Sequence, residues 1–160
     1  MFVHDFVAVP LPIAVAVAAL SSTLGSNSRD FVVEAWKFDR SVWTAAGLRR
    51  EDLTPGNRFS MVIGRARVRP EGVVIPFSWT GSGARLIPAL DSDLELAARG
   101  PAASDLQLLG RYQYESAPPR SVSEASLSHR ATVVAVRQFL VLISTAMADL
   151  AGASTARFEV

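Results

Sequence analysis

The chain opens with a segment whose side chains alternate between two faces. In residues 1–9, Val3 and Val7 fall on one face, and this period of two predicts a β-strand. Residues 13–22 are then rich in alanine and apolar almost all round, which predicts a short buried helix. We expect this helix to stop near Gly25, because glycine commonly follows the last turn of a helix.

The pattern between residues 28 and 46 fits two structures. Apolar side chains such as Val32, Trp36 and Ala46 follow helical spacing, which favours a second helix. Residues 31–38 also alternate locally, so a strand is the competing interpretation. We favour the helix, because the helical spacing extends over the whole segment.

After residue 58 the pattern changes from helices to strands. Alternating side chains predict strands in residues 58–69, 72–80, 85–97 and 106–114. The links between them are short and contain the turn-forming residues Gly and Pro. A parallel crossover needs a dozen or more residues, so these links predict an antiparallel meander.

The last segment predicts a long amphipathic helix. Ser121 and Glu124 fit a capping box, in which both side chains bind backbone N–H groups at the helix start. We expect Gly152 to end the helix, which at about thirty residues would be roughly 45 Å long and cross the whole sheet. The predicted buried stripe comprises Val122, Ala125, His129, Val133, Val136, Leu140, Ile143, Met147 and Leu150, flanked by Thr132 and Phe139.

Composition excludes several classes of protein. Of the 160 residues, 49% are hydrophobic and 19% charged, which indicates a folded chain of one domain. The net charge of +1, without a basic cluster, argues against nucleic-acid binding. There is no cysteine, and the two histidines lie far apart in sequence, so we expect no thiolate chemistry, no metal site and no cofactor.

The apolar run in residues 6–20 resembles a targeting or membrane segment. It is shorter than the ~20 residues that span a bilayer. It also contains Pro10 and Pro12, and no Lys or Arg precedes it as in a secretory signal. We therefore expect no membrane insertion and a cytoplasmic protein.

The order of elements and several local motifs resemble the START/polyketide-cyclase-like superfamily, also called SRPBCC or helix-grip proteins, and in particular an uncharacterised actinobacterial branch of it. The motifs are VIPFSW at 74–79, LIPALDSDL at 86–94, LQLLGRY at 106–112, LSHRA at 127–131 and RQFL at 137–140. Ser78 departs from this pattern, because the branch usually has Arg there. The resemblance implies an α+β helix-grip fold: a curved antiparallel sheet wrapped around a long C-terminal helix, with two shorter helices after the first strand. Residues 1–152 would form this single domain, and residues 153–160 a C-terminal tail.

Aromatic side chains occupy the inward-facing positions of two predicted strands. They are Phe77 and Trp79 on one strand and Tyr112 and Tyr114 on another. Such rings offer a large apolar area, and Trp and Tyr add a polar group that can orient a ligand. Simple core packing explains the same pattern equally well.

The C-terminal helix contributes the other candidate residues. His129 is the one polar-capable side chain among the apolar positions of the predicted stripe, with Val133 and Val136 beyond it. A histidine there fits a hydrogen bond to a ligand or a general acid/base. A structural histidine, satisfied by a group of the sheet, is the somewhat stronger alternative.

Acidic and basic side chains occupy alternate positions of two strands of the predicted meander. The carboxylates are Asp91, Asp93 and Glu95, and the arginines are Arg65, Arg67 and Arg69. Carboxylates spaced along one extended strand are poorly placed to surround one cation. We expect them to form surface ion pairs with the arginines.

The resemblance implies that an apolar small molecule, such as a lipid or a polyketide, binds between the sheet and the C-terminal helix. The predicted lining is Phe77, Trp79, Tyr112, Tyr114, His129, Val133 and Val136. One alternative is a cyclase or dehydratase with His129 as acid/base and a tyrosine hydroxyl as electrophile. Another is a structural or interaction module with a filled core, in which case we expect a homodimer.

Overall fold

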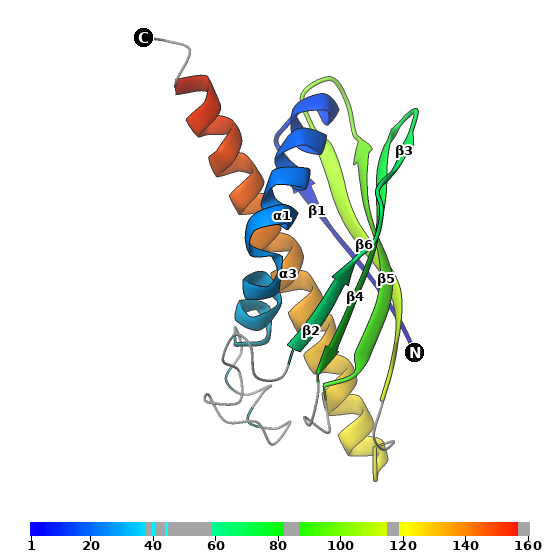
Figure 1. Cartoon of the computed structure of the whole chain (residues 1–160). Coiled ribbons are helices and arrows are strands. Elements are labelled where there is room, and N and C mark those ends of the chain that lie inside the picture. Colours follow the sequence, from blue (N-terminus) through cyan, green and yellow to red (C-terminus); the bar gives the residue numbers. More distant parts are fainter. Residues whose placement is uncertain (38–39, 41–43, 45–58, 82–86, 115–118, 157–160) are drawn as a thin grey trace.

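The computed structural model describes residues 1–37, 40, 44, 59–81, 87–114 and 119–156 (Figure 1). Its elements are, in order, β1 (Phe2–Val9), α1 (Ile13–Lys37), β2 (Phe59–Ile63), β3 (Arg67–Arg69), β4 (Gly72–Gly81), β5 (Ala89–Ala98), β6 (Ser104–Gln113) and α3 (Val122–Ala156). The strands curve along one side of the molecule, and α1 and α3 pack side by side against the other (Figure 1).

All strand pairs in the sheet are antiparallel. The six-stranded sheet has the order β1-β6-β5-β4-β2, and β3 also pairs with β4. β1 therefore joins the last strand of the meander, with Val3 opposite Gly110. A curved antiparallel sheet holding a long C-terminal helix is the helix-grip fold, and this prediction is confirmed.

The core lies between the inner face of the sheet and the two helices. On the sheet side, alternate residues of β5 and β6 are buried, as the period of two predicts, whereas β4 begins with four consecutive buried residues and alternates after them. On α3, the buried side chains are Ser128, Ala131, Thr132, Ala135, Val136, Phe139, Leu140, Ile143 and Met147.

The predicted phase of the stripe on α3 is wrong in its first half. His129 and Val133 are exposed, whereas Ser128 and Thr132 are buried. The Thr132 hydroxyl donates to the Ser128 carbonyl at 2.8 Å, which lowers the cost of burying it. A prediction from hydrophobic spacing alone therefore misplaced the buried face of α3. Such a prediction treats Ser and Thr as surface residues, although their hydroxyls can bond to a carbonyl of the same helix.

The predicted stop near Gly25 is also wrong, because α1 runs through this residue without a break to Lys37. Gly25 is exposed, and the helix on either side of it is held by buried residues such as Leu24 and Val32. Glycine inside a helix costs about 1 kcal/mol relative to alanine. Burial of side chains such as Leu24 and Val32 contributes more than this, so the helix continues through the glycine. The favoured helix is confirmed for residues 28–37, and the rest of that segment lies largely outside the described residues.

The strand predicted for residues 58–69 is divided into β2 and β3. The pairing with β4 advances by one residue between Ile63 and Arg67, so the chain bulges there. Pro76 of β4 lies opposite the break; it has no N–H to donate, and its carbonyl accepts the Gly64 N–H at 2.7 Å. The proline thus explains a break that the alternation did not show.

The two ends of α3 differ from the prediction in detail. Glu124 N–H donates to Ser121 Oγ at 3.1 Å, as the capping box requires, while the Glu124 carboxylate accepts from the Arg120 N–H. The helix continues past Gly152 to Ala156, so the predicted stop is wrong. By length and composition its stretch Val122–Ala153 could cross a membrane, but its buried side chains are part of the core against α1 and the sheet.

Candidate functional site

A cluster of aromatic rings in mutual contact fills the middle of the described interior. Phe77 of β4 stacks on Phe139 of α3 at 4.9 Å between ring centroids, with an angle of 24°. Trp79 meets Phe139 edge-on at 6.0 Å and Trp36 of α1 at 6.4 Å. All of these side chains are buried. Of the two explanations for the inward position of Phe77, ligand lining and core packing, its stacking on Phe139 favours core packing.

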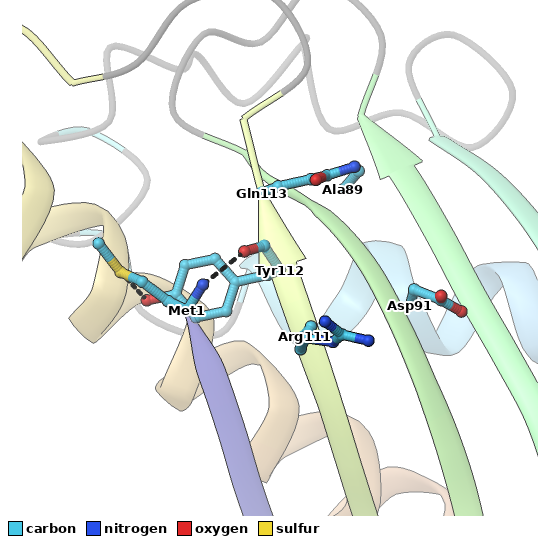
Figure 2. A pocket seen from close by; sticks show the side chains of 6 residues that line it. All are labelled: Met1, Ala89, Asp91, Arg111, Tyr112 and Gln113. Atoms are coloured by element: carbon cyan, nitrogen blue, oxygen red, sulfur yellow. Dashed lines mark hydrogen bonds between the residues drawn. The ribbon is translucent and has the colours of Figure 1, made fainter.

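A second group of side chains lies where β6 ends beside the first turns of α3. Tyr112 is buried, and its hydroxyl is within hydrogen-bonding distance of His129 Nδ1. The two rings also stack, with centroids 5.9 Å apart. The same hydroxyl lies 2.8 Å from the Met1 sulfur, and the Met1 nitrogen donates to the Tyr112 carbonyl (Figure 2). Tyr114 is half-buried and meets Tyr112 edge-on at 6.5 Å.

The predicted lining residues therefore fall into two sets. Phe77, Trp79, Tyr112 and Val136 are buried, and Tyr114 is half-buried. Val133 is 36% exposed, and His129 is exposed although it reaches Tyr112. His129 thus lies beside the buried face of α3 and not within it.

Burial lowers the acidity of the Tyr112 hydroxyl. Removal from water, as the larger cause, and the charge of the nearby Tyr114 raise the pKa of Tyr112 to about 12. Like any tyrosine well below its ordinary pKa of 10.0, the phenol is neutral near pH 7 and has one hydrogen to donate. That hydrogen lies within reach of the Met1 sulfur, which is a weak acceptor, and of His129 Nδ1, which accepts or donates according to the histidine tautomer.

Several buried polar atoms of the described residues have no hydrogen-bond partner. They include the indole Nε1 atoms of Trp36 and Trp79, the hydroxyl of Tyr114 and the hydroxyl of Thr23. Trp79 lies in the same inward row as Leu90 and Tyr112. A buried donor without a partner costs about 1–3 kcal/mol, so each such atom calls for an explanation.

Trp36 is a site residue that sequence reasoning missed. It lies in the segment for which helix and strand competed, and its depth depends on α1 continuing beyond Gly25. Its spacing from Val32 and Val33 on one helical face was the available signal.

Two hollows lined by described residues lie on or beside the outer face of the sheet. One, of about 460 Å³, lies at the ends of β5 and β6 and is lined by Met1, Ala89, Asp91, Arg111, Tyr112 and Gln113 (Figure 2). The other, of about 490 Å³, also includes Asp91 and Arg111, and extends to Phe2 and Leu109. The Arg111 guanidinium lies 5.8 Å from the centre of the exposed Phe2 ring.

The alternating charges on the sheet form ion pairs, as predicted for two of the arginines. Arg67 lies 3.2 Å from Asp93, and Arg69 lies 3.5 Å from Glu95. Gln107 also donates to Glu95, at 3.0 Å. Both carboxylates are therefore engaged by arginines of β3, across the intervening strand β4, and Glu95 also by Gln107 of the adjacent strand β6.

Comparison with known proteins gives structural matches only, since no protein-family model and no curated protein matches the chain. The Zhui aromatase/cyclase from Streptomyces sp. R1128 is similar with a TM-score of 0.43 and 12% identity, over 89% of this chain and 93% of that one. Ara h 8.0201 has a TM-score of 0.35 and 9% identity, over 91% and 98%. Protein CV1439 from Chromobacterium violaceum has a TM-score of 0.34 and 11% identity, over 89% and 96%. The fold assignment itself rests on the sheet order and the long helix described above.

Proposed function

We propose that the protein binds an apolar small molecule, of lipid or polyketide type, on the inner side of the sheet near Tyr112 and Trp79. The observation that carries this proposal is the coexistence of aromatic walls with a few buried polar atoms that lack partners, on Trp36, Trp79 and Tyr114. Ligand pockets typically combine an apolar lining with a small number of polar groups.

The packing of α3 supports this end of the interior as the site. Among residues 122–130, all of them described, Ser128 is the one buried residue, whereas buried residues recur regularly from Ala131 to Met147. The first turns of the helix are thus more exposed to solvent than the rest, so a ligand could approach the interior at this end. Burial of about 200 Å² of ligand surface here would contribute roughly 5 kcal/mol before the costs of association.

Native mass spectrometry of the freshly purified protein, together with thermal shifts across a panel of lipids and polyketides, tests the proposal. The expected result is a co-purified apolar adduct or a ligand that stabilises the fold. Consistent absence of both would contradict the proposal.

A matched pair of variants locates the site. Val133 and Val141 lie on the same helix and are both 36% exposed, but Val133 is close to His129 and Val141 is two turns further along. Val133→Arg places a charge one helical turn from His129, at the end of the interior proposed as the site, and is expected to abolish ligand binding, while Val141→Arg is expected to retain it. Equal binding by both variants would rule out this location.

The contact between Tyr112 and His129 favours a second candidate, an enzyme of cyclase or dehydratase type. In the histidine tautomer that carries its hydrogen on Nδ1, His129 would donate to the Tyr112 oxygen, the Tyr112 hydroxyl would donate to a substrate carbonyl, and His129 Nε2 would act as the acid/base. If such an activity is found, a His129→Ala variant that keeps it would remove this candidate. The expectations of a cytoplasmic location, a homodimer and the actinobacterial branch remain predictions.

A further inference from the structure

We infer that the outer face of the sheet, where β1, β6, β5 and β4 lie side by side, binds the same face of a second copy of this chain. The described helices α1 and α3 pack against the inner face, so they leave the outer face uncovered (Figure 1). The inference goes beyond the proposed function, because the proposed ligand lies on the inner side of the sheet. It also gives the predicted homodimer a specific interface.

Three exposed apolar side chains gather on this face. Phe2 is 72% exposed, Phe6 52% and Leu109 55%. Leu109 of β6 lies opposite His4 of β1. Phe2 and Phe6 are the next residues of β1 on the same face, so both rings are diagonal neighbours of Leu109. A cluster of exposed apolar residues with a polar rim is typical of a surface that another molecule covers.

Two charged side chains on this face have no ion-pair partner among the described residues. Arg111 of β6 lies directly opposite Asp91 of β5, and both are exposed. No hydrogen bond joins them (Figure 2), and neither takes part in the ion pairs that the described strands and helices form. The Arg111 guanidinium lies instead 5.8 Å from the centre of the Phe2 ring. Each charge is therefore available to a partner on this face.

The positions of these charges favour a second copy over a different partner. Face-to-face packing around a two-fold axis that runs along the strands, midway between β5 and β6, brings Arg111 of each copy to Asp91 of the other. One surface then supplies both charges of both ion pairs, as an isologous interface requires. Leu109, two residues from Arg111, then lies over the hollow of about 490 Å³ on the other copy.

The edge of the sheet is closed to a second copy, which leaves the face. On the edge strand β1, the Phe6 carbonyl accepts from Arg137 at 2.7 Å, and the Phe6 N–H donates to Asp5 at 2.8 Å. Arg137 also donates to the Asp5 carboxylate, at 2.9 Å. These main-chain groups in the middle of the strand are occupied, so they cannot pair with a strand of another molecule.

The size of the face sets the strength of the interaction. β5 and β6 have ten residues each, which is about 33 Å of strand, and the four strands at about 4.8 Å spacing cover a width of roughly 19 Å. The face is thus about 600 Å² per copy, below the roughly 800 Å² of a standard interface. We expect a reversible dimer with a dissociation constant in the micromolar range.

Sedimentation equilibrium across a wide range of protein concentration tests the inference. The wild-type protein should show a reversible equilibrium between monomer and dimer. Leu109→Lys places a charge in the interface and should weaken the dimer by roughly tenfold or more. Leu150→Lys is the matched control, because Leu150 is 43% exposed but lies near the end of α3, and this variant should dimerise like the wild type.

Two charge reversals test the two-fold pairing itself. Arg111→Asp leaves two facing carboxylates in place of each ion pair, and Asp91→Arg leaves two facing guanidinium groups. Either variant alone should therefore be monomeric at concentrations where the wild type dimerises. A mixture of the two variants should form heterodimers, because opposite charges then meet again. Circular dichroism shows whether both variants are folded; if one is not, the pair of leucine variants decides the question alone.

Wild-type protein that stays monomeric at every concentration would overturn the inference and leave this face to a small molecule or to a different protein. Equal dissociation constants for Leu109→Lys and Leu150→Lys, or folded charge-reversal variants whose mixture stays monomeric, would overturn it as well. None of these outcomes bears on ligand binding in the interior, which is measured separately.

Discussion

Gly110 is the position where one added carbon tests the arrangement of the strands most sharply. It lies on the inner face of β6, directly opposite Ser92 of β5. A Cβ atom at Gly110 would lie 2.5 Å from the Ser92 Cβ, 2.8 Å from the Asp91 carbonyl oxygen and 3.0 Å from the Ser92 Cα. The last two are backbone atoms, so Gly110→Ala forces the strands themselves apart.

The expected loss of stability follows from these distances. Overpacking that moves backbone costs about 1–3 kcal/mol, and replacing glycine recovers about 0.5–1 kcal/mol through the unfolded chain. At the middle of both ranges the net loss is about 1 kcal/mol, which for a chain of this size lowers the Tm by about 2–4 °C. Thermal unfolding followed by circular dichroism measures it.

Gly100→Ala is the matched control, because nothing lies within 4 Å of the position its Cβ would occupy. Its Tm should stay within about 1 °C of the wild type or rise slightly. Equal Tm values for Gly110→Ala and Gly100→Ala would refute the pairing of β5 with β6, and with it the row that aligns Tyr112 with Trp79.

Three further predictions concern side-chain contacts. Because the pKa of Tyr112 is raised to about 12 from an ordinary 10.0, the folded state keeps a proton that the unfolded chain releases. The free energy of unfolding should therefore fall as pH rises from about 10 to 12, and Tyr112→Phe should remove this part of the slope in denaturant titrations. Arg137 donates to the carbonyl of Phe6, on the edge strand β1, at 2.7 Å. Arg137→Ala should therefore lower the free energy of unfolding by about 1 kcal/mol in a urea titration, and an unchanged value would show that the contact does not stabilise the fold. Arg67→Ala removes the exposed pair with Asp93, so its Tm should change by no more than about 2 °C; a much larger fall would contradict its surface role.

Strand alternation and the helix cap were readable from the sequence, because each depends on near neighbours in the chain. The period of two placed Phe77 and Trp79 correctly on the inner face. The division of β2 from β3 was not readable, since it arises where Pro76 of another strand cannot donate.

The phase of α3 and the length of α1 depend on tertiary contacts, which sequence spacing does not contain. His129 was assigned to the buried stripe, but Ser128 takes that place. The sequence did name both Tyr112 and His129, yet only the fold brings them together. Trp36 was missed as a site residue because its burial requires a helix that passes through a glycine.

The central claim is that the ligand lies on the inner side of the sheet, between the strands and α3. Nuclear Overhauser contacts between a bound apolar ligand from the lipid and polyketide panel and assigned aromatic protons test it most directly. The account predicts contacts to the rings of Trp79 and Tyr112. Contacts to Phe2 and Leu109 instead would place the molecule in the outer hollow and contradict the account.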